Sequence, residues 1–187
     1  MDAPQASYIG IDPSLSKTGL ACISKDGLTT RLVKTPLTGV ERLRYYRDEL
    51  KTFLEMALLK GKILCVCIEG PSLGSINRAD DLGQLRGVLS VCARDYCPRV
   101  VIVAPTSLKK FATGGGGAKK EAVIKAAAKK WGVELSDDEA DAAFLAFLAQ
   151  AVYGNADRLT RAQMGVVRGI KTVVAKPRLS PRSRDNI

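Results

Sequence analysis

The sequence predicts a single α/β domain in which a mixed central sheet is flanked by helices. Near the start of the chain, three short strand-like segments follow one another with tight turns between them, which is typical of an antiparallel meander. Farther along, helical segments alternate with short, continuous apolar segments, as expected where helices cover a parallel part of a sheet. The length of 187 residues suits one domain with a sizeable core.

The meander is predicted from three alternating or apolar segments, at residues 7–12, 19–24 and 28–34. The first segment ends in an acid, Asp12, and a turn rich in Pro, Ser and Gly separates it from the second. An Asp-Gly turn signal at residues 25–27 joins the second segment to the third. Short turns of this kind predict antiparallel pairing of neighbouring strands.

The remaining elements alternate between helix and strand. We predict helices over Gly39–Lys60, residues 79–94, residues 119–131 and Asp137–Tyr153, and strands over residues 63–68 and 100–104. In the first helix apolar residues recur every three or four positions, and Gly61 follows its end. Ser136 and Glu139 have the spacing of a capping box at the start of the last helix. Four consecutive glycines at residues 114–117 predict a mobile loop.

The packed domain is predicted to cover residues 1–156, followed by a basic tail over residues 157–187. From residue 157 onward we find no apolar periodicity, and eight basic residues stand against two acids, a net charge of 8 − 2 = +6. We therefore expect the tail to be partly disordered.

Composition excludes several kinds of chemistry. The chain has no histidine, which rules out a Ser-His-Asp triad, a histidine base and a Cys/His zinc finger. Its five cysteines match no zinc spacing, and we expect them to be reduced, buried thiols. The N-terminal residues do not resemble a signal peptide, and no apolar segment approaches the roughly 20 residues that span a bilayer. We therefore expect a cytoplasmic protein.

The net charge of +10 predicts a polyanionic partner, and nucleic acid is the usual one for a small basic domain. An anionic membrane is the competing partner. No basic amphipathic helix with a strong aromatic face supports it.

Four acids stand in positions where a sheet and a helix could bring them together. Asp12 and Glu69 end strand-like segments, while Asp138 and Asp141 lie three apart near the start of the last predicted helix. Each acid alone would be read as a turn former or a helix-end residue. Because ligand sites in open α/β sheets lie at the carboxyl ends of strands, the joint pattern predicts one site.

Converging carboxylates repel one another unless a cation holds them, and oxygen ligands favour Mg²⁺, with Mn²⁺ able to substitute. Two such ions, roughly 4 Å apart, would support phosphodiester hydrolysis without a histidine. The residues themselves therefore favour a metal-dependent nuclease.

Four short motifs carry a resemblance to a known family. They are residues 9–14 (Ile-Gly-Ile-Asp-Pro-Ser) with Thr18-Gly19, the pair Ile68-Glu69, residues 82–88 (Leu-Gly-Gln-Leu-Arg-Gly-Val) and residues 138–143 (Asp-Glu-Ala-Asp-Ala-Ala). In this order they resemble RuvC-type Holliday-junction resolvases of the ribonuclease H-like superfamily, over residues 7 to about 153. Divergent phage members of that family are similar in retaining the motifs while recognition elements change.

The resemblance implies a ribonuclease H-like fold and assigns roles to particular residues. Asp12, Glu69, Asp138 and Asp141 would bind two metal ions per site. Lys109 and Lys120 would act near the scissile phosphate and belong with the acids among the catalytic residues. The residues expected at the DNA are these two lysines, their neighbours Lys110 and Lys119, and Arg78, Arg86 and Leu73.

The resemblance further implies a homodimer that cuts opposite strands of a four-way DNA junction. The helix over residues 79–94 would be the dimer element, although a simple core-facing helix is an equal alternative. Two departures concern recognition: Ser14 stands where the family has glycine, and Gly70-Pro71 follows Glu69 in place of a Gln and a bulky residue.

Three other functions stay open. A phosphotransferase related to actin and sugar kinases would share the Gly-Ile-Asp and Thr-Gly pattern, but the chain is short for two lobes and shows no adenosine site. A non-catalytic, architectural DNA-binding protein would use only the basic surface. A less selective flap or branch nuclease would share every catalytic residue.

Overall fold

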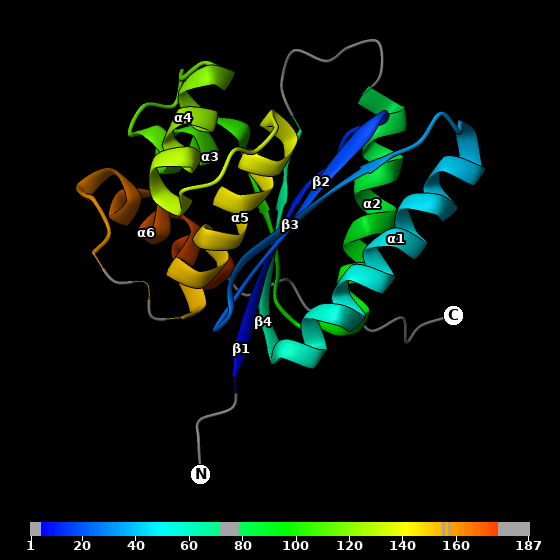
Figure 1. The fold of residues 1–187 in the computed structure, drawn as a ribbon, viewed down its shortest axis with the longest axis horizontal. Helices are drawn as coiled ribbons and strands as arrows, with labels where there is room; N and C mark the ends of the chain where they lie inside the picture. The colour runs from blue at the N-terminus through cyan, green and yellow to red at the C-terminus, as the bar shows by residue number, and fades with distance from the viewer. Residues whose placement is uncertain (1–4, 72–78, 155, 157, 176–187) are drawn as a thin grey trace, which may run out of the picture.

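The structure is a computed structural model, and it describes residues 5–71, 79–154, 156 and 158–175 (Figure 1). The strands are β1 (Ala6–Asp12), β2 (Lys17–Ser24), β3 (Gly27–Lys34), β4 (Lys62–Glu69) and β5 (Val100–Val103). The helices are α1 (Gly39–Lys60), α2 (Ala79–Tyr96), α3 (Pro105–Thr113), α4 (Lys120–Trp131), α5 (Asp137–Tyr153) and α6 (Arg161–Ala175).

The five strands form one sheet in the order β3-β2-β1-β4-β5. Strands β3, β2 and β1 pair antiparallel, as the short turns predicted, whereas β1, β4 and β5 pair parallel through helical crossovers. The prediction of a mixed sheet flanked by helices is confirmed. Helix α1 covers the predicted range Gly39–Lys60, and α5 the predicted range Asp137–Tyr153.

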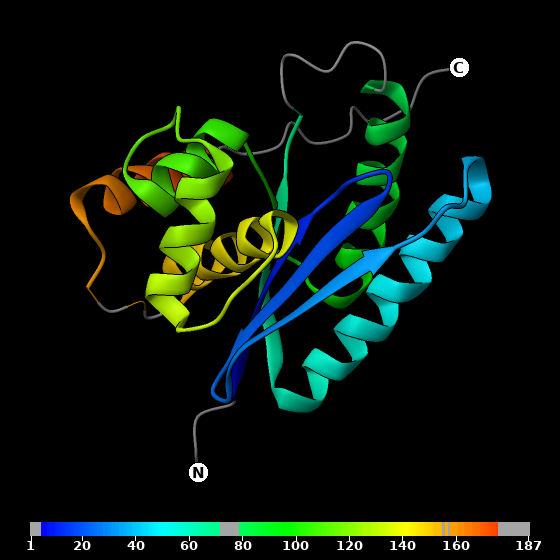
Figure 2. The same cartoon turned by 45° about the horizontal axis from the view of Figure 1, so that its top comes forward.

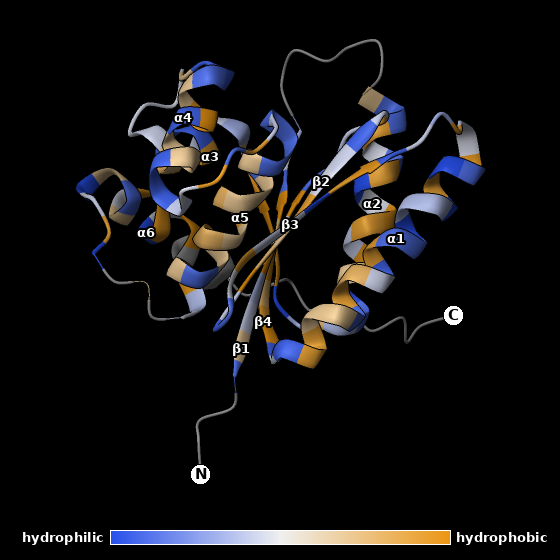
Figure 3. Ribbon diagram, viewed as in Figure 1, coloured by the Kyte–Doolittle hydropathy of each residue, from blue (hydrophilic) through white to orange (hydrophobic). Residues whose placement is uncertain are grey.

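Helices cover both faces of the sheet. Helices α1 and α2 lie on one face, and α5 lies on the other with α3, α4 and α6 outside it (Figures 1 and 2). Each face therefore encloses its own apolar cluster. Figure 3 shows hydrophobic stretches along the strands and hydrophilic stretches on the outer helices α4 and α6. Helix α5 lies between sheet and outer helices, which explains why most of its residues are buried and why few are polar.

Two glycines allow α5 to lie directly on the β1–β2 hairpin. A Cβ at Gly10 would stand 1.9 Å from the carbonyl oxygen of Ala142, and one at Gly19 would stand 2.0 Å from that of Asp138. No real side chain fits at such distances, so the absence of a Cβ sets how closely the helix approaches the sheet. This close contact fixes the position of the first turn of α5 against the ends of the two strands.

Helix α3 was not predicted, because we interpreted the segment after β5 as a connection to the glycine loop. The segment carries ordinary helix signals: Pro105 stands in the first turn, and Gly114 ends the helix in the left-handed conformation with φ 92°. Leu108 and Phe111, three apart, are the buried side chains of the helix. A pattern of only two apolar positions is too short to show a period, so packing against α5 completes the helix.

Helix α6 corrects the expectation that apolar periodicity ends at residue 157. Val166 and Val167 are buried against α3 and α5, and the Gln163 amide nitrogen donates to the Phe111 carbonyl oxygen at 3.1 Å. The helix was missed because Gly165 and Gly169 disfavour helix and interrupt the apolar pattern. Residues 176–187, the rest of the predicted tail, lie outside the described residues, so the division into domain and tail stays a prediction.

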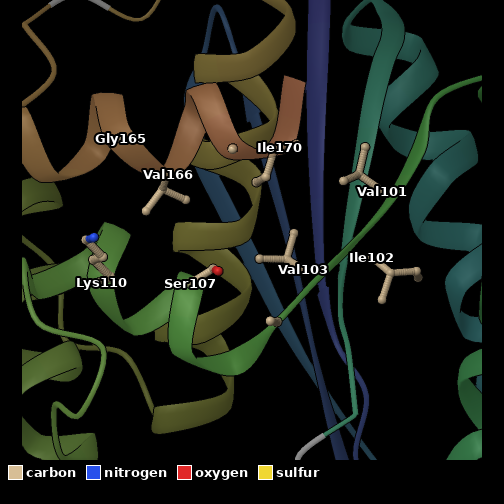
Figure 4. A pocket seen from close by; sticks show the side chains of 10 residues that line it. Val101, Ile102, Val103, Ser107, Lys110, Gly165, Val166 and Ile170 are labelled. Carbon is tan, nitrogen blue, oxygen red and sulfur yellow. The ribbon is translucent and has the colours of Figure 1, made fainter. Parts of the chain in front are cut away.

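A cavity of about 360 Å³ lies where β5, α3 and α6 meet (Figure 4). Val101 and Val103 from β5 and Val166 and Ile170 from α6 give it apolar walls, and the Lys110 side chain lies at its edge. None of the four predicted site acids lines it. The cavity therefore belongs to the packing of α6, not to the predicted site.

Candidate active site

The ends of β1 and β4 bring the first two predicted acids side by side. Ile11 and Ile68 are partners in the parallel pairing of β1 with β4. Asp12 is the residue after Ile11, and Glu69 is the residue after Ile68. Both carboxyl groups therefore start from the same edge of the sheet. This is the edge at which the carboxyl ends of the parallel strands lie, as predicted.

The start of α5 adds the other two acids. In the antiparallel pairing of β1 with β2, Gly19 lies opposite Asp12, and the Asp138 backbone rests directly on Gly19. Asp138 and Asp141 follow within the first two turns of the helix. The fold thus gathers all four acids from β1, β4 and α5.

A capping box fixes where α5 begins. The Ser136 hydroxyl accepts from the Glu139 amide nitrogen, and the Glu139 carboxylate accepts from the Ser136 backbone amide at 3.2 Å. Thr30 on β3 donates its hydroxyl to the same carboxylate at 3.0 Å. The assignment of Glu139 to the cap rather than to the metal site is consistent with these three contacts.

Asp12 is the most strongly perturbed of the acids. Burial raises its pKa well above the usual range, and the charges of Glu69 and then Asp141 raise it further. A hydrogen bond joins the carboxyl groups of Asp12 and Glu69, and burial also raises the pKa of Glu69. Each carboxyl group is therefore harder to ionise than a free one, as expected for two buried acids side by side.

The helix acids are perturbed in the same direction. Burial, followed by the charge of Glu69, raises the pKa of Asp141 to about 7. Burial also raises the pKa of Asp138, although a contact with Lys17 acts in the opposite sense. The charge of Glu69 raises the pKa of Asp141, and the charges of Asp138 and Asp141 raise the pKa of Asp12. The four acids therefore form one electrostatic site.

The site fits a hard divalent cation by the chemistry of its donors. One oxygen of Asp138 and one of Asp141 are buried and accept no hydrogen bond from the described residues. Buried carboxylate oxygens without partners are costly, and an oxygen-binding ion would satisfy them. As the side chains lie here, the described residues contain no group of three His, Cys, Asp or Glu that could hold a metal ion. Binding therefore requires these carboxyl groups to turn toward one another.

Three of the predicted basic residues act on these acids. Lys109 on α3 and Lys120 on α4 both lower the pKa values of Glu69 and Asp141. Arg86 on α2 donates its Nε hydrogen to the Glu69 carbonyl oxygen at 3.0 Å, which ties α2 to the end of β4. These cations lie around the acids on three different helices.

The other predicted DNA contacts lie farther from the acids or outside the described residues. Lys110 lines the cavity beside α6 (Figure 4), and Lys119 is exposed at the N-cap of α4. Leu73 and Arg78 fall outside the described residues. A role in DNA binding stays a prediction for all four.

Two residues beside the acids were not predicted. The Lys17 ammonium lies 3.0 Å from an oxygen of Asp138 and 3.4 Å from one of Asp137, and Lys120 also donates a hydrogen bond to Asp137. These contacts hold the pKa of Asp137 down to about 2, with the Lys120 hydrogen bond as the largest cause. The sequence signal was their position, next to Thr18-Gly19 and next to Asp138, but nothing local showed that the two segments meet.

A mixed sheet in this order, with acids at the ends of its central parallel strands and on the helix packed across them, defines the ribonuclease H-like class of α/β nucleases. The family model for crossover junction endodeoxyribonuclease RuvC matches residues 8–152. A protein with the same name from Anaeromyxobacter sp. (strain Fw109-5) is 32% identical, over 94% of this chain and 84% of that protein. The chain therefore belongs to the RuvC family, which comprises metal-dependent endonucleases.

Two solved structures show the same fold. Thermus thermophilus RuvC in complex with a Holliday junction substrate is similar with a TM-score of 0.64 and 22% identity, over 88% of this chain and 98% of that one. Thermus thermophilus RuvC alone is similar with a TM-score of 0.60 and 24% identity, over 75% and 90% of the two chains. Membership of a nuclease family decides against the phosphotransferase and the non-catalytic alternatives.

No helix among the described residues is long and apolar enough to cross a membrane.

Proposed function

We propose that this protein is a structure-selective DNA endonuclease that resolves four-way junctions by paired, metal-dependent hydrolysis of phosphodiester bonds. The observation that carries the proposal is geometric: Asp12 and Glu69 end two paired parallel strands, and α5 rests on Gly19 beside them, where it adds Asp138 and Asp141. Cutting DNA also suits a chain with a net charge of +10. We place this activity in the cytoplasm, where the DNA of a bacterial or phage-infected cell lies.

The metal we propose is Mg²⁺, with two ions per site and Mn²⁺ able to substitute. The donors would be Asp12, Glu69, Asp138 and Asp141, since all are carboxylates and Asp138 and Asp141 each have a buried oxygen that accepts no hydrogen bond from the described residues. When bound, such ions supply a nucleophile at neutral pH and stabilise the leaving oxygen. Binding of the ions would favour the ionised acids and so oppose the rise in pKa that burial causes at Asp12, because ligands must be deprotonated.

The basic residues would position the DNA backbone. Lys109 and Lys120 reach the acids electrostatically from α3 and α4, so a phosphate at the acids would lie within the field of both ammonium groups. Arg86 donates a hydrogen bond to the backbone carbonyl oxygen of Glu69 and so helps to hold this residue at the edge of the sheet. Phosphate contacts of this kind recognise the shape of DNA more than its sequence.

Paired cuts require two sites, and we propose a homodimer formed through α2. This helix buries Leu85 and Leu89 toward the sheet and leaves Val91, 68% exposed, on its outer side. A Cβ at Gly83 or Gly87 would meet no atom within 4 Å, so another chain could approach this side closely. Sedimentation equilibrium tests the proposal, and a Val91→Glu variant that stays dimeric would contradict it.

The test is cleavage of a labelled synthetic four-way junction with Mg²⁺, beside flap and linear duplex substrates. We expect symmetric paired nicks near the branch point. Asp12→Asn should lower the cleavage rate by about 10³-fold or more, because it removes a ligand, while junction binding is kept. The matched control is Asp26→Asn, which changes an exposed acid in the β2–β3 turn and should cut as wild type does.

Each other outcome is informative. Equal cutting of flaps and junctions would keep the chemistry but make the protein a general branch nuclease, the alternative that the Gly70-Pro71 departure favours. Tight junction binding without cleavage in Mg²⁺ or Mn²⁺ would contradict the catalytic proposal.

A further inference from the structure

Lys17 forms a contact at the acidic site that the proposed chemistry does not use. Its ammonium lies 3.0 Å from Oδ2 of Asp138, the same oxygen that is buried and accepts no hydrogen bond of acceptable geometry. At this distance the contact is an ion pair. The ion pair therefore balances the negative charge of Asp138 but leaves Oδ2 without a hydrogen bond from the described part of the chain.

Asp137 gives the same lysine a second partner. Its Oδ1 lies 3.4 Å from the Lys17 ammonium, and its Oδ2 accepts a hydrogen bond from Lys120. The Lys17 side chain is 43% exposed, whereas that of Asp138 is only 10% exposed. The lysine can thus leave Asp138 and keep a carboxylate partner at the surface, while Asp138 cannot reach solvent.

The position of this oxygen matters for metal binding. The backbone of Asp138 rests on Gly19, which lies opposite Asp12, and Oδ2 of Asp138 is its buried oxygen, so a cation shared by these acids would bind at this oxygen. A divalent ion and an ammonium cannot both stand against one carboxylate oxygen without strong mutual repulsion.

We propose that Lys17 is a positioning residue, a built-in cation that occupies Asp138 in the metal-free protein, competes with the divalent ion for it, and moves to Asp137 when the ion binds. This inference rests on the proposed function, since it assumes that Asp138 is a metal ligand. The competition would set the ion concentration at which the nuclease becomes active.

The test measures binding of Mn²⁺ alone, without DNA, by isothermal titration calorimetry on the full chain. Lys17→Met keeps a long, unbranched side chain and removes its charge, so Mn²⁺ should bind about three- to fivefold more tightly. Lys17→Arg keeps the charge and should return the affinity toward the wild-type value. The matched control is Lys51→Met, which removes an exposed lysine paired with Glu55 on α1 and should leave Mn²⁺ affinity unchanged.

A second measurement separates this inference from the proposed function. The melting temperature in EDTA should fall for Lys17→Met, and the rise on adding Mn²⁺ should be larger than in wild type. Unchanged or weaker Mn²⁺ binding by Lys17→Met, with Asp138→Asn still impairing binding, would overturn the competition alone. No effect of Asp138→Asn on Mn²⁺ binding would overturn both this inference and the proposed metal site.

Discussion

At the scale of single residues, burial decides the chemistry of the acids. Asp12, Glu69, Asp138 and Asp141 have raised pKa values, and burial is the largest cause for each. Asp137, one residue from Asp138, has its pKa lowered to about 2 because Lys120 donates a hydrogen bond to it. Neighbouring acids thus differ because one faces the interior and the other faces two lysines.

This difference predicts how stability depends on pH when no metal is present. The pKa of Asp141 is about 7 in the folded protein, against roughly 3.9 in an unfolded chain. The folded state therefore holds a proton that the unfolded chain releases, so the stabilisation is complete below about pH 4 and is lost as the pH rises through 7. The contribution of Asp137 to stability depends on pH in the opposite sense. It is complete above about pH 4 and is lost as the pH falls through about 2, so it does not change between pH 5 and pH 8.

We expect the melting temperature in EDTA to fall on the order of 5 °C between pH 5 and pH 8, and the fall to be smaller in Asp141→Asn. Mg²⁺ should restore stability at pH 8, since the ion replaces the lost protons. Thermal unfolding followed by circular dichroism measures this. A melting temperature in EDTA that rises over this range would contradict the buried, protonated state of the acids.

At the scale of elements, the approach of α5 to the sheet positions the site. The helix rests on Gly10 and Gly19, and this contact sets the distance between Asp138 and the ends of β1 and β2. The acids on β1 and β4 are placed by strand pairing, but those on α5 depend on packing. A change that lifts α5 should therefore disturb the site as well as the core.

Gly10→Ala tests this dependence. Its Cβ would stand 1.9 Å from the Ala142 carbonyl oxygen, so we expect a loss of about 2–4 kcal/mol in the free energy of unfolding and weaker Mn²⁺ binding. The control is Gly165→Ala in α6, where a Cβ meets nothing within 4 Å and should stabilise by about 0.5–1 kcal/mol. Urea unfolding measures both, and equal stability of the two variants would show that α5 does not lie as described.

At the scale of the whole molecule, α6 adds to the packed part of the chain, and the sequence after it is rich in basic residues. This helix joins the packed part of the chain through Val166 and Val167, which the sequence did not show. Residues 176–187 contain four basic residues and one acid, a net charge of 4 − 1 = +3 of the total +10. We expect this segment to add sequence-independent affinity for DNA.

Removing residues 176–187 should weaken binding to linear duplex and make its dependence on salt shallower. The slope of log affinity against log salt should fall in magnitude by about 2–4, because up to four phosphate contacts are lost. Fluorescence anisotropy across a salt series measures the slope. A full-length chain with Gln at Lys176, Arg178, Arg182 and Arg184 is the control for length, and a wild-type slope in that chain would contradict the proposal.

The sequence by itself determined the elements whose signals are local. Strand β1 ends in Asp12, β4 ends in Glu69, and the capping box places Asp138 and Asp141 in the first turns of α5, so these acids and the order of these three elements could be stated without a structure. Period, turn residues and caps are properties of neighbouring residues, and they are therefore readable along the chain.

Only the tertiary structure decided what depends on contacts between distant segments. Lys17 and Asp137 are 120 positions apart, and they meet because β2 pairs with β1 while α5 rests on Gly19. Helices α3 and α6 have weak patterns of their own and are stabilised by burying Phe111, Val166 and Val167 against one another and α5. The energy of such contacts depends on two segments that meet only in the folded protein. The local sequence of either segment therefore does not predict them.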